Sequence, residues 1–298
     1  MRFAQVSFAG ATEPQLTVVR GDRGRLVAEL FDGAPHTLQR LIEGGDELLA
    51  RVREAVDAPS SRHADDDADG PWHPLDGAAF APAVSTPPVV LAVGLNYAAH
   101  SSELGLEADT APTVFVLWPN SLAGHDGTTT WPRALSESVD YEAELGVVIG
   151  KAARNVVASD ALDHVWGYTV VDDITARDIQ FSEAQWSRCK SFDGFTPVGP
   201  VVVTADEIPD PQDLHIWAVV DGRTVQDAST AQMIRPVASL IAHLSASATL
   251  LPGTLISTGS PGGAGYSRDP QIFLRDRSTV TVGVDGIGAL TTHCRIVG

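Results

Sequence analysis

Val139-Asp140-Tyr141-Glu142-Ala143-Glu144-Leu145-Gly146-Val147-Val148-Ile149-Gly150 joins a pair of acidic residues to a run of apolar ones. Successive side chains of a strand point to opposite faces, so Glu142 and Glu144 share one face while Ala143 points away. The apolar run Leu145–Ile149 indicates that this strand is buried. Two buried carboxylates on one face repel each other unless a proton or a cation lies between them. The stretch therefore predicts a buried strand that begins at a divalent-cation site.

A third candidate ligand follows a second strand-like run. Tyr168–Val171 is aromatic and β-branched, which predicts a strand, and Asp172 and Asp173 lie at its end. Strand ends often lead into loops that carry functional residues. Three carboxylates without a nearby His or Cys suit Mg²⁺, Mn²⁺ or Ca²⁺ and not zinc. An alternative role for Asp172 is to cap a helix that starts near Thr175.

Composition and charge exclude several classes of protein. The chain has 298 residues, and its net charge of −18 argues against a nucleic-acid partner. No segment approaches the roughly 18 to 20 apolar residues of a membrane span, and the N-terminus lacks a long apolar signal segment. Cys189 and Cys294 have no zinc-type spacing, which favours reduced thiols. We therefore expect a cytoplasmic protein that does not contact a membrane.

The chain divides into a small N-terminal part and a larger β-rich part. Residues 1–70 are expected to form a small α+β domain, followed by a linker at 71–88 and a catalytic domain at 89–298. The predicted elements of the first part are strands Phe3–Phe8 and Gln15–Arg20, a helix over Leu38–Ala55 and an acidic loop over 58–71.

Short β-rich runs with close Pro and Gly punctuation dominate the second part, and the clearest helix spans Ala231–Leu244. This pattern favours a β-rich α+β fold over a doubly wound sheet. The predicted strands are Val89–Val93, Thr113–Leu117, Leu145–Ile149, Val201–Val203, Ile216–Val220, Leu255–Ile256 and Val280–Val284.

Seven stretches form an ordered set of motifs along the chain: Val93–Glu103, Glu142–Leu145, Asp173–Gln180, Gln185-Trp186, Lys190–Asp193, Pro197–Pro200 and Thr258–Gly265. In this order they resemble the fumarylacetoacetate hydrolase family, in its branch of acylpyruvases and 2-hydroxyhepta-2,4-diene-1,7-dioate isomerases. The resemblance implies a mixed β-roll or sandwich core with the small N-terminal domain beside it, and a homodimer. It also implies that Glu142, Glu144 and Asp173 hold Mg²⁺, or Mn²⁺, with Ca²⁺ as a substitute in a crystal.

The resemblance assigns further roles to residues of these motifs. His100 and Glu103 would lie on one helix face, where the carboxylate can orient the imidazole as a general base. The matching Lys190 would hold a substrate oxygen. Residues implied in substrate binding are Tyr97, Gln180, Thr258 and Ser260. A plain tight turn is the alternative for the glycine-rich stretch that contains Thr258 and Ser260. In contrast, Arg177 and Asp178 are interpreted as a structural ion pair.

Two positions depart from the family pattern. Leu117 stands where a Lys is usual, and His125 stands where a Pro is usual. The exchange of Lys for Leu removes a cation and adds apolar surface, which suggests a substrate with a less anionic end or a larger apolar group. Alternatively, His125 replaces part of the lost cation. Both residues are therefore candidates for substrate binding.

These observations predict a metal-dependent hydrolase that cleaves a C–C bond of an acylpyruvate-like 2-oxo acid through an enolate. Decarboxylation or enol–keto isomerisation of a related 2-oxo acid is an alternative, because both reactions use the same chelating unit. A second alternative is a repurposed or non-catalytic member of the fold, or a purely structural cation site. The expected partner is a small-molecule 2-oxo acid.

Overall fold

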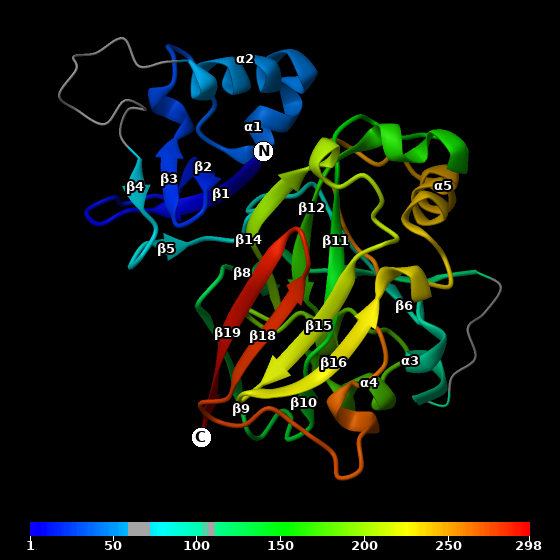
Figure 1. The fold of residues 1–298 in the computed structure, drawn as a ribbon. Coiled ribbons are helices and arrows are strands. Elements are labelled where there is room, and N and C mark those ends of the chain that lie inside the picture. Colours follow the sequence, from blue (N-terminus) through cyan, green and yellow to red (C-terminus); the bar gives the residue numbers. More distant parts are fainter. Residues whose placement is uncertain (59–71, 104, 106–110) are drawn as a thin grey trace.

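The computed structural model describes residues 1–58, 72–103, 105 and 111–298. Within them the chain forms one large mixed sheet, a smaller sheet and short helices (Figure 1). This arrangement confirms the predicted β-rich α+β class with a mixed core. Apart from Ala58, the predicted acidic loop lies outside the described residues.

The large sheet follows the order β4-β3-β2-β1-β14-β12-β11-β17-β6-β7, with β5 beside β1 and β8 beside β14. Most neighbours are antiparallel, while β17 pairs with β6 and β8 with β14 in parallel. The strands are β1 (Arg2–Ser7), β2 (Gln15–Arg20), β3 (Arg23–Leu26), β4 (His73–Pro74), β5 (Ala79–Phe80), β6 (Val90–Gly94), β7 (Thr113–Leu117), β8 (Leu122–Ala123), β11 (Ala143–Ile149), β12 (Val165–Asp172), β14 (Thr196–Thr204) and β17 (Leu255–Ser257).

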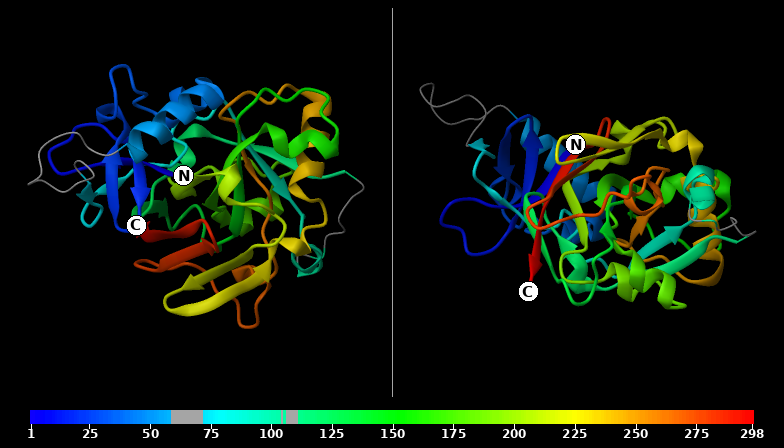
Figure 2. Two further views of the ribbon diagram at one scale, coloured as in Figure 1. Left: turned by 45° about the horizontal axis from the view of Figure 1, so that its top comes forward. Right: turned by 90° about the horizontal axis from the view of Figure 1, so that it is seen from below.

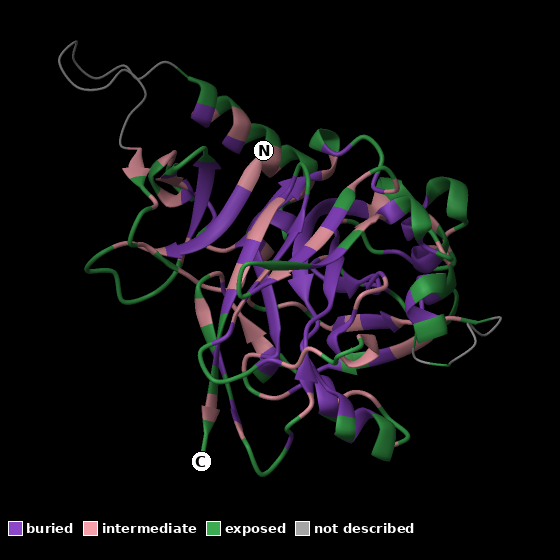
Figure 3. Cartoon of the chain, turned by 60° about the horizontal axis from the view of Figure 1, so that its bottom comes forward, coloured by how far each residue is buried: buried purple, intermediate pink, exposed green. Residues whose placement is uncertain are grey.

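Strands β11 and β12 form the centre of this sheet. Every residue of both strands is buried, and Figure 3 shows the purple central strands enclosed by more exposed elements. Strands covered on both faces read as continuous apolar runs, which explains Leu145–Ile149. The prediction of a buried strand is therefore confirmed. A two-stranded ladder of β10 (Val139–Asp140) and β13 (Thr175–Ala176) extends from the same end.

The second sheet has the order β16-β15-β18-β19-β9 and packs against β11, β12 and β14 (Figure 2). The contact buries Ile216, Ala218, Val280 and Val282 beside residues of the central strands. Two sheets packed in this way form the sandwich-like core. The strands are β9 (Gly127–Pro132), β15 (His215–Val220), β16 (Arg223–Ser229), β18 (Thr279–Val284) and β19 (Gly288–Val297).

The N-terminal strands continue the large sheet, because β1 pairs with β14 at Phe3 and Val202. The predicted domain limits at residues 70 and 88 stay predictions. The single helix predicted over Leu38–Ala55 is two helices, α1 (Leu38–Glu43) and α2 (Gly45–Asp57). The break falls at Gly44-Gly45, where Gly45 adopts a φ of +65° that favours glycine.

Three further helices border the sheets: α3 (Ala98–Glu103), α4 (Arg177–Ser182) and α5 (Val237–Ser247). The helix predicted over Ala231–Leu244 starts later, because Pro236 disfavours helical backbone in the residue before it. Among the described helices, none is long and apolar enough to span a membrane.

Candidate metal centre and active site

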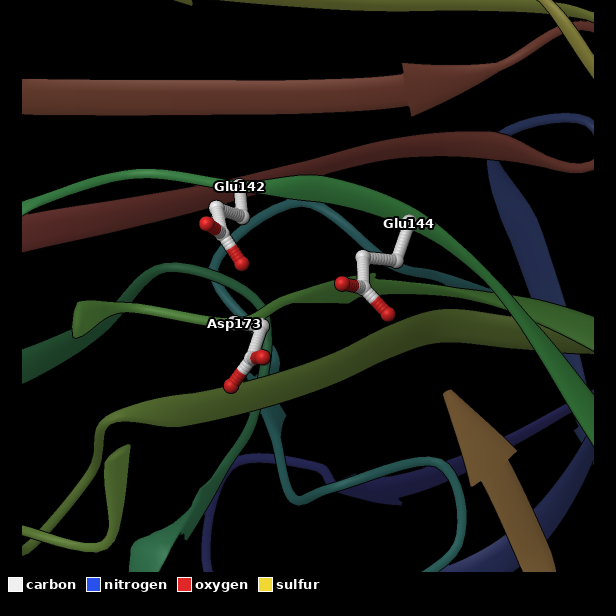
Figure 4. Close-up of side chains that lie close together, drawn as sticks. All are labelled: Glu142, Glu144 and Asp173. Carbon is white, nitrogen blue, oxygen red and sulfur yellow. The ribbon is translucent and has the colours of Figure 1, made fainter. Parts of the chain in front are cut away.

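The pairing of β11 with β12 brings the predicted ligands together. Ala143 lies opposite Asp172, and the backbone N–H of Asp173 donates to the carbonyl of Glu142 at 2.9 Å. Glu142 precedes β11 and Glu144 lies within it, so their side chains leave the same face. The three carboxylates of Glu142, Glu144 and Asp173 point into a common space (Figure 4).

The electrostatics of this acidic triad, Glu142, Glu144 and Asp173, favour a bound cation. One oxygen from each residue lies within 4.8 Å of the others, and the residues are 3%, 2% and 1% exposed. Burial and the charges of Asp173 and Glu142 raise the pKa of Glu144 to about 8. Burial also raises the pKa of Asp173 to about 6, although Lys190 opposes the shift. Buried like charges have this effect because each opposes ionisation of the other.

One atom of the triad is left without a protein donor. Oδ1 of Asp173 is buried and has no hydrogen-bond partner among the described residues. A buried acceptor without a partner is costly, and a hard cation would satisfy it. The all-carboxylate donor set fits Mg²⁺, Mn²⁺ or Ca²⁺. The residues present therefore fit a divalent metal site.

Two buried cations of the protein balance part of this negative charge. Nζ of Lys190 donates to Oε2 of Glu142 at 2.8 Å and to Oδ2 of Asp173 at 2.5 Å. The Arg177 guanidinium donates to Oε1 of Glu142 at 2.5 Å and to Oδ1 of Asp140 at 2.7 Å. Burial acts to raise the pKa of Glu142, but Lys190 and Arg177 outweigh it and hold that pKa well below its usual range.

A histidine–glutamate pair borders the triad, as the sequence predicted. Nε2 of His100 lies 3.2 Å from Oε1 of Glu142, and its Nδ1 lies 3.8 Å from Oε2 of Glu103. Burial acts to lower the pKa of His100, but the carboxylates of Glu103 and Glu142 outweigh it and raise that pKa to about 8. Glu103 is fixed in turn by the Gly263 N–H at 2.9 Å and the Ser267 hydroxyl at 3.0 Å.

The glycine-rich turn after β17 holds one carboxylate of the triad. Oε2 of Glu144 accepts from the Gly259 N–H at 2.8 Å and from the Ser257 hydroxyl at 2.5 Å. Gly259 has a φ of +97°, and a Cβ there would lie 2.7 Å from Cβ of Asn96. Only glycine allows this approach with that backbone conformation. The turn thus binds the side-chain carboxylate of Glu144.

A cavity connects these groups, and the structure brings only some of the predicted substrate-binding residues to it. Gln180 and Ser260 line the cavity, whereas Tyr97, Leu117, Thr258 and His125 are not among its described lining residues. That lining consists of Val93, Gly94, Leu95, His100, Phe115, Glu142, Glu144, Asp173, Gln180, Trp186, Lys190 and Ser260.

The predicted residues outside the lining have other contacts. Nδ1 of His125 accepts from the Thr291 N–H at 3.0 Å, and the Thr258 hydroxyl donates to the carbonyl of Leu145 at 2.8 Å. Leu117 is 1% exposed within an apolar cluster. Tyr97 is equally buried, and burial and the charge of Glu144 raise the pKa of its hydroxyl.

Two smaller interpretations of the sequence are wrong. Arg177 does not pair with Asp178, which accepts from the Ser136 hydroxyl and the Ile179 N–H. Asp172 does not cap a helix; its Oδ1 accepts from the Glu142 N–H at 3.1 Å, and α4 begins later, at Arg177. The carboxylate partner of Arg177, Asp140, and the N–H partner of Asp172, that of Glu142, are both brought close by strand pairing.

Arg177 is the site residue that sequence reasoning missed. In an extended chain Asp140 points to the same side as Glu142 and Glu144, because every second side chain does. Three acids on one side of the chain were therefore a sequence signal for a cationic partner. The third contact of Arg177 is with Gln180, whose Oε1 accepts at 2.9 Å. Arg177 therefore connects a metal-ligand candidate to a residue of the cavity.

A sequence profile decides how this arrangement is classified. The profile of the fumarylacetoacetate hydrolase C-terminal region matches residues 89–295, which is more than half of the chain. The chain belongs to the fumarylacetoacetate hydrolase family. The enzymes of this family in the comparisons include hydrolases and isomerases.

Three solved structures show how far the similarity extends. The fumarylacetoacetate hydrolase of Exiguobacterium antarcticum is 30% identical with a TM-score of 0.82, and all of both chains is covered. The 2-hydroxyhepta-2,4-diene-1,7-dioate isomerase of Mycobacterium marinum is 29% identical with a TM-score of 0.75, covering 100% of this chain and 99% of that one. The maleylpyruvate hydrolase of Sphingobium sp. SYK-6, in complex with manganese(II) and pyruvate, is 25% identical with a TM-score of 0.80 over all of both chains.

Membership of the fumarylacetoacetate hydrolase family confirms the resemblance drawn from the motifs. It establishes the chain as an enzyme of a family that acts on small molecules, with an acidic triad that fits a divalent metal. The neighbours differ in the reaction that their names state, so the family alone leaves the reaction and the substrate open.

Proposed function

We propose that this family member is a divalent-cation-dependent hydrolase that cleaves a C–C bond of an acylpyruvate-like 1,3-dicarbonyl substrate. The observation that carries the proposal is the convergence of the acidic triad, His100 and Lys190 on one cavity, with Glu103 beside His100. Acid–base groups beside a cluster of metal-ligand carboxylates are the components of metal-assisted hydrolysis.

Glu142, Glu144 and Asp173 would hold the cation, with Mg²⁺ or Mn²⁺ as the proposed ion. The unpartnered Oδ1 of Asp173 and the manganese(II) and pyruvate in the Sphingobium enzyme support this assignment. A bound divalent cation supplies Lewis acidity toward the two oxygens of a 2-oxo acid.

The side chains around the cavity have separate roles in this proposal. The imidazole of His100, which has the Glu103 carboxylate 3.8 Å from its Nδ1, takes a proton from water, and the oxygen of that water forms a bond to the acyl carbonyl carbon. The bond between this carbon and C3 of the 2-oxo acid then breaks. Its electron pair remains on C3, which takes up a proton to give pyruvate, while the acyl group leaves as a carboxylic acid.

Lys190 and Gln180 would hold the substrate during these steps, together with the Ser260 hydroxyl. The ammonium group of Lys190 is positioned to stabilise negative charge that develops on a substrate oxygen. Arg177 fixes Gln180 and Glu142 in their relative positions. These assignments keep Tyr97, Leu117, Thr258 and His125 outside substrate contact.

Enol–keto isomerisation or decarboxylation of a related 2-oxo acid is the second candidate function. The similarity to the isomerase of Mycobacterium marinum favours it. In that reaction His100 would move a proton between substrate atoms without activating water. The same cavity residues serve both candidates, and the products distinguish them.

We also propose a homodimer in the cytoplasm. Strand β7 is the outer strand of the large sheet, and Val116 and Trp118 expose 43% and 44% of their surface beside that edge. Exposed apolar side chains at a sheet edge favour association. Both cysteines are unpaired and buried, which suits a reducing compartment.

Product analysis tests the proposed reaction. Purified protein is treated with EDTA, supplied with Mg²⁺ or Mn²⁺, and incubated with acetylpyruvate or oxaloacetate. Formation of acetate and pyruvate from acetylpyruvate, lost in His100→Ala, supports hydrolysis. Release of CO₂ from oxaloacetate alone, or an absorbance change without new products, would replace it with the second candidate.

A further inference from the structure

The lining of the cavity comprises polar and apolar residues. The polar ones include the acidic triad, His100 and Lys190. The apolar ones, which we call the apolar wall, are Val93, Leu95, Phe115 and Trp186. The two groups meet where Nζ of Lys190 lies 5.6 Å from the ring centroid of Phe115, so a 2-oxo acid whose reacting end lies at the acidic triad has its distal group near this wall.

Two aromatic rings give the apolar wall its shape. The rings of Phe115 and Trp186 meet edge to face, with centroids 5.6 Å apart and planes at 69°. Trp186 packs directly over Gly94, where a Cβ would lie 2.4 Å from Cζ3 of the indole. Edge-to-face pairs stabilise each other beyond the area they bury, so the two rings form a defined surface.

Among the described residues that line the cavity, each group that can carry positive charge already contacts a carboxylate, so a second carboxylate of the substrate finds no free counter-ion. Of the described residues that line the cavity, His100 and Lys190 can carry positive charge, and both contact Glu142. The guanidinium of Arg177 is bonded to Asp140, Glu142 and Gln180. A carboxylate against the apolar wall would lose its hydration without gaining a partner, which is costly.

Leu117 extends the same apolar character behind the cavity. It lies two residues after Phe115 on β7, so both side chains leave the same face of the strand, and both are buried in one apolar cluster. The Lys that is usual at this position would place an amine in that apolar cluster. The net charge of −18 further disfavours a doubly anionic ligand.

We propose that the substrate carries an apolar distal group that packs against Phe115 and Trp186, and that the enzyme selects such 2-oxo acids over those with a second carboxylate. This inference rests on the proposed function, because it places the 2-oxo acid end at the acidic triad. Phe115 and Trp186 are the specificity-determining residues.

Binding of two ligands of similar shape tests the selectivity without turnover. 5-Methyl-2-oxohexanoate and 2-oxoglutarate differ in having a distal isopropyl group or a distal carboxylate. Calorimetric titration of the Mn²⁺-loaded protein should show at least about tenfold tighter binding of the isopropyl ligand. Equal or tighter binding of 2-oxoglutarate would overturn the selectivity alone. Absence of binding by both ligands would overturn the proposed 2-oxo acid site as well.

Variants test whether the apolar wall causes the selectivity. Trp186→Ala should weaken binding of 5-methyl-2-oxohexanoate by about tenfold and leave 2-oxoglutarate within about twofold. Trp217→Ala is the matched control, because Trp217 lies on β15, donates to Asp285 and is not a described lining residue; it should change neither affinity. Equal weakening of both ligands by Trp186→Ala would show a general role and overturn the assignment.

Discussion

Nζ of Lys190 lies 2.8 Å from Oε2 of Glu142, so a cation of the protein already contacts a carboxylate proposed to bind the metal. Its second contact, with Oδ2 of Asp173, reaches another ligand candidate. Burial acts to lower the pKa of Lys190, but Asp173 and Glu142 outweigh it and raise that pKa. Lys190 therefore stays charged, and it both reduces repulsion within the triad and repels an incoming cation.

Lys190→Met separates these two effects. We expect acetylpyruvate turnover to fall by at least about a hundredfold, because substrate oxygens lose a charge-assisted donor. Mn²⁺ affinity, measured by calorimetry, should stay equal or increase because a nearby positive charge is gone. Loss of Mn²⁺ binding together with activity would instead mean that Lys190 holds the triad in place.

Arg177→Met should destabilise the protein strongly. The guanidinium is fully buried between Asp140 and Glu142, and its removal leaves Asp140 without its ion-pair partner and Glu142 with Lys190 and His100 alone. Breaking a buried ion pair on one side costs about 3–5 kcal/mol. Urea unfolding measures this loss.

A double variant identifies the source of that loss. Arg177→Met with Asp140→Asn should recover part of the unfolding free energy, because one uncompensated charge is removed as well. If the two losses simply add, the destabilisation comes from lost packing and not from charge.

Gly259→Ala should weaken cation binding by distorting the turn that holds Glu144. The new Cβ would lie 2.7 Å from Cβ of Asn96 and 2.9 Å from the carbonyl oxygen of Val93, at a φ of +97°. Strain of this kind costs on the order of 1–3 kcal/mol, and the Gly259 N–H that binds Glu144 would shift.

Gly222→Ala is the matched control, because Gly222 has a φ of +81° but no atom within 4 Å of an added Cβ. Gly259→Ala should lower Mn²⁺ affinity, whereas Gly222→Ala should lower only the unfolding temperature. Equal Mn²⁺ affinities in both variants would refute a role of the turn in holding Glu144.

Stability should depend on pH and on the cation together. The folded protein raises the pKa of Glu144 from about 4.5 to about 8, so folding favours its protonated form. This contribution is complete below the unfolded pKa and is lost as the pH rises toward 8. The EDTA-treated protein should therefore unfold at a lower temperature at pH 8 than at pH 5.5.

The same linkage predicts the effect of added cation. Divalent ions bind the ionised carboxylates, so Mn²⁺ should raise the unfolding temperature more at pH 8 than at pH 5.5. An equal rise at both pH values would mean that the triad is already fully ionised at pH 5.5 without the cation.

Local strand rules allow the acidic triad to be predicted from sequence. Glu142 and Glu144 share a face by alternation, and the fully apolar run after them indicates burial. The roles of Arg177 and Asp172 could not be predicted, because their partners become neighbours only through pairing of β10 with β13 and of β11 with β12. The position of His125 could not be predicted either, because its imidazole accepts from the N–H of Thr291, which is far along the chain. His125 is not among the described lining residues of the cavity.

Cation binding by the acidic triad is the central claim, and calorimetric titration of the EDTA-treated protein with Mn²⁺ tests it most directly. The wild type should bind one ion per chain, Asp173→Asn should bind it at least about tenfold more weakly, and Asp178→Asn, a neighbouring acid outside the triad, should match the wild type. Equal Mn²⁺ affinity in Asp173→Asn and the wild type, or no binding by the wild type, would contradict the metal centre described here.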